Sequence, residues 1–266
     1  ISYSVGYNNF TTDGWRTNAG QQSNIGSGFI QAELSPRTSV QAEYRYRSDR
    51  RGDTRLMFFP DDFFSNLQQR VITNTYRLGV KHELSADSIL LGSFIYRNAQ
   101  SNLNVGDLDV LAANNAGFLG LSAANFQRPE DAMTGEVQHL FRSQYLNLVT
   151  GGSLSNVQSN LNTNLTLDPV AFGFPPGTII LPNQNIAPNR SSLDHTQGVA
   201  YGYSYLKPLQ NLTLTLGASG QFRDGEQLEQ NGKALVNPKF GIIYTPIPGT
   251  VIRLAAFQTL KRTLVT

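Results

Sequence analysis

The sequence predicts an all-β protein, an antiparallel transmembrane β-barrel of which this chain holds about eleven strands. Three observations support this prediction. Apolar and polar residues alternate with a period of two in many short segments, and the connections between these segments alternate in length. Aromatic residues gather near the ends of several segments. We expect residues 1–266 to form a single barrel domain, a fragment of a longer chain that lacks at least one strand.

Composition fits a barrel better than a soluble or helical membrane protein. Hydrophobic residues make up 39% of the chain and charged residues 15%, against about 25% charged residues in soluble domains. No segment approaches the roughly 20 continuous apolar residues of a membrane helix, whereas only alternate residues of a barrel strand meet lipid. The net charge of +2 gives no strong attraction for nucleic acid. The absence of cysteine excludes disulfide scaffolds and thiolate metal sites.

The clearest alternation lies in residues 211–222, where leucine and threonine take turns. Segments with the same pattern recur near the length of about 10 residues that a tilted membrane strand needs. The predicted strands span 1–10, 24–34, 39–49, 71–84, 88–99, 134–142, 145–158, 196–206, 211–223, 237–245 and 250–260.

Short and long connections follow one another strictly along the chain. Short turns fall at 35–38, 85–88, 142–144, 207–210 and 246–249, and long connections at 11–23, 50–70, 100–133, 159–195 and 224–236. Outer-membrane barrels have tight periplasmic turns and long extracellular loops, so the pattern predicts this location and places Ile1 at the periplasmic side. Within the third long connection, residues 108–113 and 120–125 are candidates for a short helix.

The alternation assigns one row of side chains to lipid and the other to a polar lumen. The residues expected to face lipid are Val40, Tyr44, Leu78, Val80, Leu212, Leu214 and Leu216. The residues expected to line the lumen are Glu33, Glu43, Arg45, Arg47, Arg77, Lys81 and Glu83. Such charges set the selectivity of a pore, or they pair across strands and brace its wall. Their mixed signs favour bracing, and both roles are compatible.

Aromatic residues at strand ends predict girdles at the two membrane interfaces. Tyr44, Tyr46, Phe94, Tyr96 and Phe222 close the outer ends of their strands, and Tyr244 lies at an inner end. Segment 198–205 places Val199, Tyr201, Tyr203 and Tyr205 in one row by the same alternation. The alternative interpretation is that aromatic residues are simply good strand formers.

The long connection 50–70 is too apolar for a plain solvated loop, because it contains Phe58, Phe59, Phe63 and Phe64. Three arrangements are open: the loop folds inward, packs on a neighbouring loop, or contacts a partner protein.

Residues for catalysis or metal binding do not form any known pattern in this sequence. The histidines, His82, His139 and His195, lack other ligand residues at metal-site spacing. Asp194 directly precedes His195, and no nucleophile motif accompanies this acid–histidine pair. We therefore expect no enzymatic activity, no metal and no cofactor.

Two stretches resemble known bacterial outer-membrane proteins. Residues 34–47, with the Phe59-Pro60-Asp61-Asp62-Phe63 stretch that follows, and residues 237–262 resemble the C-terminal barrel of proteins that carry tetratricopeptide repeats before the barrel. Residues 237–262 are also similar to late barrel strands of TonB-dependent receptors, in an Asn-Pro-Lys strand and an Arg-Leu strand. The first resemblance implies export of polymers and the second implies active uptake.

These observations lead to three hypotheses. The first is an outer-membrane pore, receptor or exporter for a solute or polymer. The second is a scaffold that anchors other envelope proteins through its outer loops or through a domain outside this chain. The third is a soluble all-β binding protein. In the first two, the lipid bilayer is the main partner.

Overall fold

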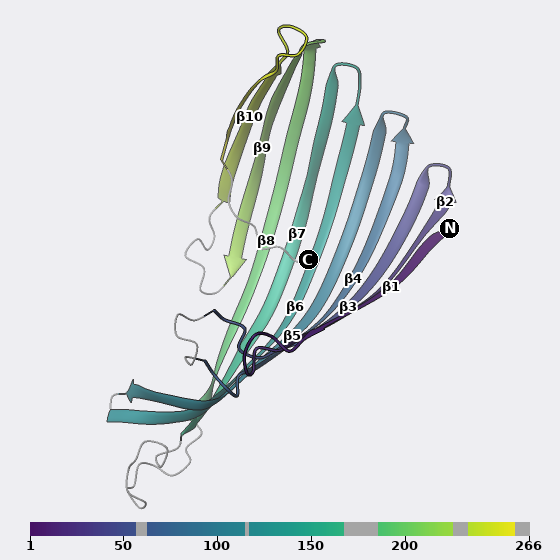
Figure 1. Cartoon of the computed structure of the whole chain (residues 1–266). Helices are drawn as coiled ribbons and strands as arrows, with labels where there is room; N and C mark the ends of the chain where they lie inside the picture. The colour runs from purple at the N-terminus through teal and green to yellow at the C-terminus, as the bar shows by residue number, and fades with distance from the viewer. Residues whose placement is uncertain (57–62, 115–116, 168–185, 226–233, 259–266) are drawn as a thin grey trace, which may run out of the picture.

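The protein forms one antiparallel sheet in which every strand pairs with its neighbour in sequence, from β1 to β11. The computed structural model describes residues 1–56, 63–114, 117–167, 186–225 and 234–258 (Figure 1). The strands are β1 (Ser2–Thr12), β2 (Gln21–Ser35), β3 (Thr38–Arg51), β4 (Gln68–Ser85), β5 (Ser88–Asn114), β6 (Gly117–Arg142), β7 (Leu146–Leu167), β8 (Ile186–Leu209), β9 (Leu212–Gly225), β10 (Ala234–Tyr244) and β11 (Ile252–Phe257). No helix in these ranges is long and apolar enough to cross a membrane.

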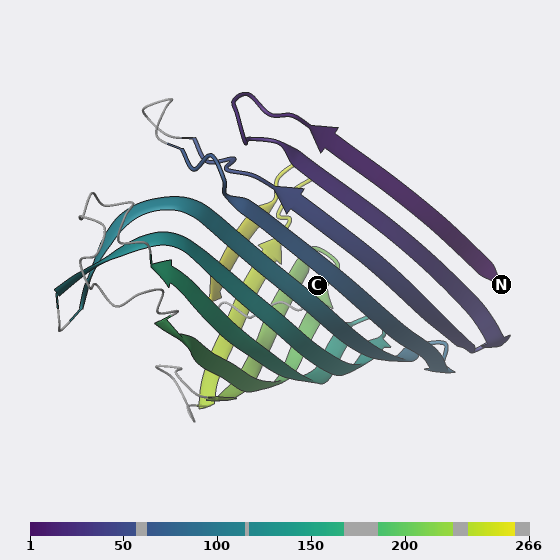
Figure 2. The same cartoon turned by 90° about the horizontal axis from the view of Figure 1, so that it is seen from below.

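The predicted all-β architecture is confirmed, with eleven strands in a single curved sheet (Figures 1 and 2). The turns that follow β2, β4, β6, β8 and β10 lie together at one end of the sheet (Figure 1). At the other end, long connections separate β1 from β2 and β3 from β4, whereas only two residues separate β5 from β6. Three of the short turns carry a register shift, between Glu33 and Ser35, between Glu83 and Ser85, and between Leu206 and Leu209. Such irregularities bend a strand and increase its twist where the chain turns back.

The hairpin of β5 and β6 is much longer than the sequence predicts, and the predicted helices are wrong. β5 has 27 residues and β6 has 26, so residues 108–113 and 120–125 belong to strands. β7 and β8 likewise extend into the predicted connection 159–195, up to Leu167 and from Ile186. A membrane crossing needs about 9–11 residues, so these strands extend far beyond the sheet's central band.

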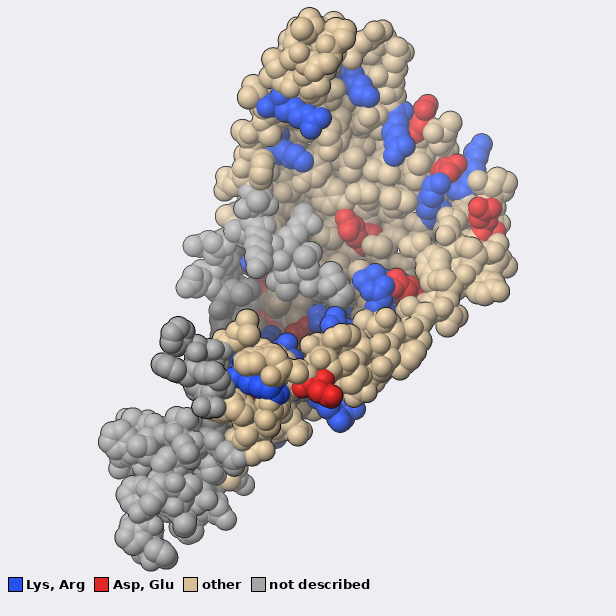
Figure 3. Space-filling view, viewed as in Figure 1, with Lys and Arg blue, Asp and Glu red and all other residues tan. Residues whose placement is uncertain are grey.

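Register divides the side chains into a concave face and a convex face. Cross-strand partners such as Val40 and Val80, or Leu78 and Phe94, share the convex face. The buried residues Thr75, Val157, Gln197 and Gln221 share the other face, as expected where curvature crowds side chains together. Figure 3 shows charged side chains gathered over the hollowed face. The sheet is therefore apolar outside and charged inside.

Glycines allow large side chains to lie flat on the convex face. Gly198 of β8 is the cross-strand partner of Phe222 of β9, and a Cβ atom at Gly198 would overlap the Phe222 ring. At Gly220, two residues earlier on β9, a Cβ atom would meet nothing within 4 Å. The two glycines therefore differ in purpose, because only Gly198 makes room for a neighbour.

This difference predicts opposite effects of the same substitution. Gly198→Ala should lower the free energy of unfolding by about 1–3 kcal/mol, because the Phe222 ring must leave its position. Gly220→Ala, the matched control, should have no cost. Urea unfolding of the folded protein, followed by tyrosine fluorescence, measures both values. Equal stability of the two variants would contradict the packing of Phe222 on Gly198.

Candidate functional site

The concave face collects the charged residues that the sequence assigns to a lumen. Register places the seven predicted lumen residues, Glu33, Glu43, Arg45, Arg47, Arg77, Lys81 and Glu83, on this face across β2, β3 and β4. It places the seven predicted lipid-facing residues, Val40, Tyr44, Leu78, Val80, Leu212, Leu214 and Leu216, on the convex face. Which solvent each face meets stays a prediction, but the separation of the two sets is a feature of the structure.

The charges on the concave face pair with opposite signs. Glu43 lies 2.9 Å from Arg45 on its own strand and 3.4 Å from Arg77 across the sheet. Glu130 on β6 lies 3.4 Å from Arg97 and 3.6 Å from Arg128. Each carboxylate thus bridges two guanidinium groups, a geometry that links neighbouring strands. These part-exposed pairs contribute little stability individually, so the arrangement favours bracing without excluding an influence on ions.

A tyrosine cluster on the same face was not predicted. Tyr201 donates a hydrogen bond to Glu136, with an oxygen–oxygen distance of 2.5 Å, and accepts one from Gln138 at 3.0 Å. Tyr203 stacks on Tyr201 at 5.7 Å between ring centroids, and the Lys239 ammonium lies 5.3 Å from the Tyr203 ring centroid. The aromatic row of 198–205 therefore belongs with the charges, while the small residues between these tyrosines lie on the convex face.

A polar cavity of about 400 Å³ opens near the short-turn end of this face. Its lining includes Gln31, Gln41, Lys81, Ser93, Glu136 and Gln138, from strands β2 to β6. The amides, the ammonium and the carboxylate offer both hydrogen-bond donors and acceptors. The concave face can therefore contact a polar solute near its short-turn end.

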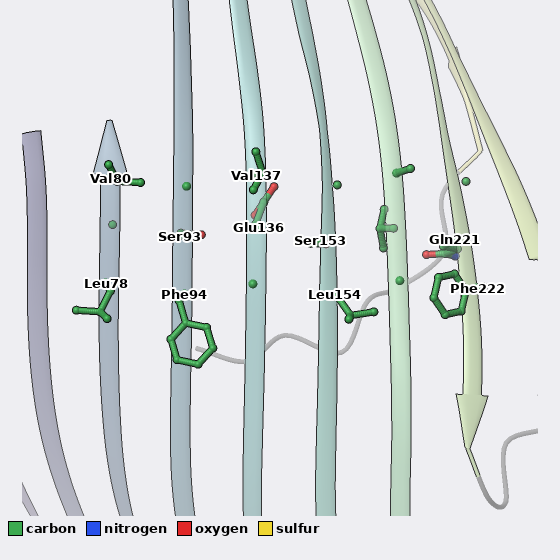
Figure 4. Close-up of a pocket in the computed structure, with 18 of the residues that line it drawn as sticks. Leu78, Val80, Ser93, Phe94, Glu136, Val137, Ser153, Leu154, Gln221 and Phe222 are labelled. Atoms are coloured by element: carbon green, nitrogen blue, oxygen red, sulfur yellow. The ribbon is translucent and has the colours of Figure 1, made fainter. Parts of the chain in front are cut away.

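The convex face carries an apolar groove of about 1030 Å³ that crosses β3 to β10. Large side chains and glycines alternate from strand to strand along it. Figure 4 shows Leu78, Phe94, Leu154 and Phe222 at one level, with Val80 and Val137 at the next. The other strands contribute glycines to these rows: Gly135 and Gly198 in the first row, and Gly92, Gly152 and Gly220 in the second. Phe94 thus lies inside the apolar band and not at the end of β5 as expected, whereas Phe222 lies close to the outer end of β9, which ends at Gly225.

Tyrosines form a row at the outer edge of this band. Ring centroids lie 5.0 Å apart for Tyr44 and Tyr76, and 6.1 Å apart for Tyr76 and Tyr96. Their hydroxyl groups point to polar partners: Tyr44 donates to Asn74, and Tyr96 donates to Asp131. An aromatic body with a hydrogen-bonded tip suits a boundary between apolar and polar surroundings.

In the described ranges, the histidines do not belong to any cluster of three or more His, Cys, Asp or Glu residues that could bind a metal ion. His82 hydrogen-bonds Thr38 at 2.9 Å and His139 hydrogen-bonds Ser88 at 2.7 Å, both near the short turns. Asp194 and His195 are consecutive strand residues, so their side chains lie on opposite faces of the sheet. They cannot act together as an acid–base pair.

At the long-loop end, Asp53 is the centre of a cluster that we call the loop lock: Trp15, Arg16, Asn18, Asp53, Arg55, Phe63 and Phe64. Asp53 is 1% exposed and accepts hydrogen bonds from Arg55 at 3.0 Å and from the backbone N–H of Phe64 at 3.1 Å. These bonds, chiefly the one from Arg55, hold the pKa of Asp53 well below its ordinary value. The buried carboxylate therefore stays charged.

Arg16 joins the first long loop to the second. Its guanidinium donates to the backbone oxygens of Asp53 and Arg55 at 3.3 and 2.9 Å, and lies 4.8 Å from the Phe63 ring centroid. Arg55 lies 5.0 Å from the Phe64 ring centroid. Of the three arrangements considered for this loop, Phe63 adopts packing on a neighbouring loop, whereas the Phe64 ring lies against Arg55 of its own loop. Phe58 and Phe59 lie outside the described residues.

Comparisons with known proteins support the fold through structure alone. No protein-family model matches the sequence, and no curated protein sequence matches it. Three solved structures are similar: FpvA of P. aeruginosa bound to pyoverdines (TM-score 0.70, 12% identity), the ferric yersiniabactin uptake receptor FyuA from Yersinia pestis (0.66, 11%) and the ferric-catecholate import receptor Fiu from E. coli K12 (0.62, 8%).

The matches cover nearly all of this chain but less than half of each receptor. They span 95%, 92% and 96% of this chain, and 37%, 40% and 49% of FpvA, FyuA and Fiu respectively. The eleven strands therefore have the fold of a section of an outer-membrane receptor barrel. The resemblance to barrels that follow tetratricopeptide repeats is not tested by these matches and stays a prediction.

The loop lock predicts a local loss of order when its central charge is removed. Asp53→Asn should weaken the link between residues 13–20 and 52–56 by about 2 kcal/mol, because the amide keeps the shape but loses the charge-assisted bonds. Hydrogen exchange at the Gly52 amide, which donates to Gly20, should then become roughly thirtyfold faster. Asp13→Asn, an exposed acid in the first long loop, is the control and should have no effect.

The lowered pKa also fixes the pH dependence of this protection. A carboxylate with a depressed folded-state pKa adds stability that is complete above its unfolded pKa and is lost as pH falls toward the folded value. Protection at Gly52 should therefore be unchanged from pH 7 to pH 5 and decrease only below 3.8, the ordinary pKa of aspartate. A loss near neutral pH would contradict the role of Asp53.

Proposed function

We propose that the chain is part of an outer-membrane β-barrel that transports a solute through a polar lumen. The separation of faces carries this proposal: a charged, hydrogen-bonded concave surface lies behind a convex surface of leucine, valine and phenylalanine. Leu78 and Val137 are 56% and 57% exposed, although both lie in mid-strand. A soluble protein rarely exposes a continuous apolar surface of this extent, whereas a barrel in lipid requires it.

We infer uptake by a TonB-dependent type of receptor as the direction of transport. The similar solved structures are described as uptake and import receptors for ferric compounds, and their barrels share this fold. In this chain the concave face would contact the passing solute through the polar cavity and the tyrosine cluster. The cargo that we propose is accordingly a polar chelate too large for simple diffusion. We propose no covalent chemistry.

The scaffold hypothesis keeps one supporting observation, the apolar segment in the second long loop. Phe63 and Phe64 nevertheless pack against arginines of the chain itself, so they offer little surface to a partner protein. Binding of other envelope proteins to segments outside this chain would not conflict with the transport hypothesis. A scaffold and a transporter differ in whether the lumen conducts.

Membrane placement predicts an asymmetric response to arginine on adjacent residues of β9. Leu216→Arg puts a charge on the convex face and should lower the free energy of unfolding by about 2–4 kcal/mol if Leu216 lies near the bilayer midplane. Thr215→Arg faces the lumen and should cost much less. Folding of the full-length protein into phospholipid vesicles at several urea concentrations measures both. Equal costs would refute the assignment of faces.

Transport predicts that the full-length protein in a planar bilayer passes ions, and that lumen charges affect their selectivity. The double substitution Arg45→Glu/Arg77→Glu should shift the reversal potential in a salt gradient toward cation preference. Arg70→Glu, on the convex face, is the control and should leave the reversal potential unchanged. Absence of current at every voltage would favour the scaffold hypothesis instead.

A further inference from the structure

The convex face carries two arginines that lie directly opposite each other above the tyrosine row. Arg50 near the end of β3 is the cross-strand partner of Arg70 at the start of β4. Both side chains are exposed, and neither forms a hydrogen bond or ion pair with any residue that the structure describes. Like charges directly opposite on one face of a sheet repel, so the pair is unfavourable without an anion.

The surroundings of this pair contain hydrogen-bond donors but no acid. Gln22 of β2 and Asn102 of β5 flank Arg50 and Arg70 in the same cross-strand row. The nearest acid in sequence, Asp49, faces the concave side, where it pairs with Arg47 at 2.6 Å and Ser23 at 2.6 Å. Asp53 is occupied inside the loop lock. Nothing among these neighbours neutralises the two guanidinium groups.

The height of the pair on the barrel indicates the source of the anion. Arg50 and Arg70 each lie six residues beyond a tyrosine of the row, Tyr44 and Tyr76 respectively, roughly 20 Å along a tilted strand. Tyrosine rows mark the headgroup level. A strand tilt of about 45° reduces the height of the pair above the row to about 14 Å, and long arginine side chains reach back along a surface toward the headgroups. The guanidinium groups can therefore contact phosphate groups of outer-leaflet lipids from above.

We propose that Arg50 and Arg70 form a binding site for the phosphate group of an outer-leaflet lipid. Two guanidinium groups on adjacent strands can each donate bidentate hydrogen bonds to one phosphate. Gln22 and Asn102 add amide donors at the edges of the site. The lipid's acyl chains would then lie along the apolar band below. The site rests on the membrane placement proposed above, and not on transport.

The test is lipid binding by the full-length protein in neutral detergent, measured by native mass spectrometry with lipid A that carries two phosphates. Arg50→Gln/Arg70→Gln should bind this lipid about tenfold more weakly than the unaltered protein. Arg51→Gln is the matched control, because Arg51 is adjacent and exposed but faces the lumen, where it bonds Gln69. It should bind as the unaltered protein does. Phosphatidylcholine, which has no net charge, should bind all three proteins equally.

Three outcomes overturn the site. The first is equal binding of bisphosphorylated lipid A by the double variant and the unaltered protein. The second is an equal loss in Arg51→Gln, which would reflect general charge. The third is displacement of the lipid by inorganic phosphate at the same concentration, which would make a free anion the ligand. Failure of the membrane placement is distinguishable, because the protein would then bind neither lipid A nor phosphatidylcholine.

Discussion

The structure depends on the alternation of side chains along each strand. In a single sheet, the register of a strand fixes at once which residues lie on each of the two faces. Moving the register by one residue between β3 and β4 would turn Leu78 and Val80 to the charged face and Arg77 to the apolar one. Hydrogen bonds between neighbouring strands satisfy the backbone N–H and C=O groups within the sheet, as a chain in lipid would require. Most charged side chains from β2 to β6 then lie on one face, and most large apolar side chains lie on the other.

Sequence predicts the strands well where one face is apolar and the other polar, and poorly where both faces are polar. The alternation of leucine and threonine in β9 reflects such a contrast. Beyond Tyr96 the strand β5 continues with Asn98, Gln100, Ser101 and Asn102, polar on both faces, so the amphipathic signal ends although the strand does not. The sequence therefore predicts a long connection at 100–133, whereas pairing between β5 and β6 extends the hairpin.

The candidate site was predictable in its charges but not in its tyrosines or loops. Glu43 and Arg77 stand out because charged residues alternate with apolar ones. Tyr201 and Tyr203 alternate with glycine and alanine, a pattern that does not tell which row faces lipid; only the contacts with Glu136 and Lys239 decide it. Asp53 has no local pattern at all, since its partners Arg16 and Phe64 come from two separate loops.

The loop lock also bears on the arginine pair, because both lie at the outer end of β3. Gly52 follows this strand directly, its amide donates to Gly20 at 3.0 Å, and a Cβ atom there would overlap the backbone of Asn18. That close approach requires glycine and fixes the strand end against the first loop. Arg50, two residues before Gly52, is thereby held opposite Arg70. The β3–β4 ladder pairs the two arginines, and the buried carboxylate of Asp53 holds the loop that follows this strand end.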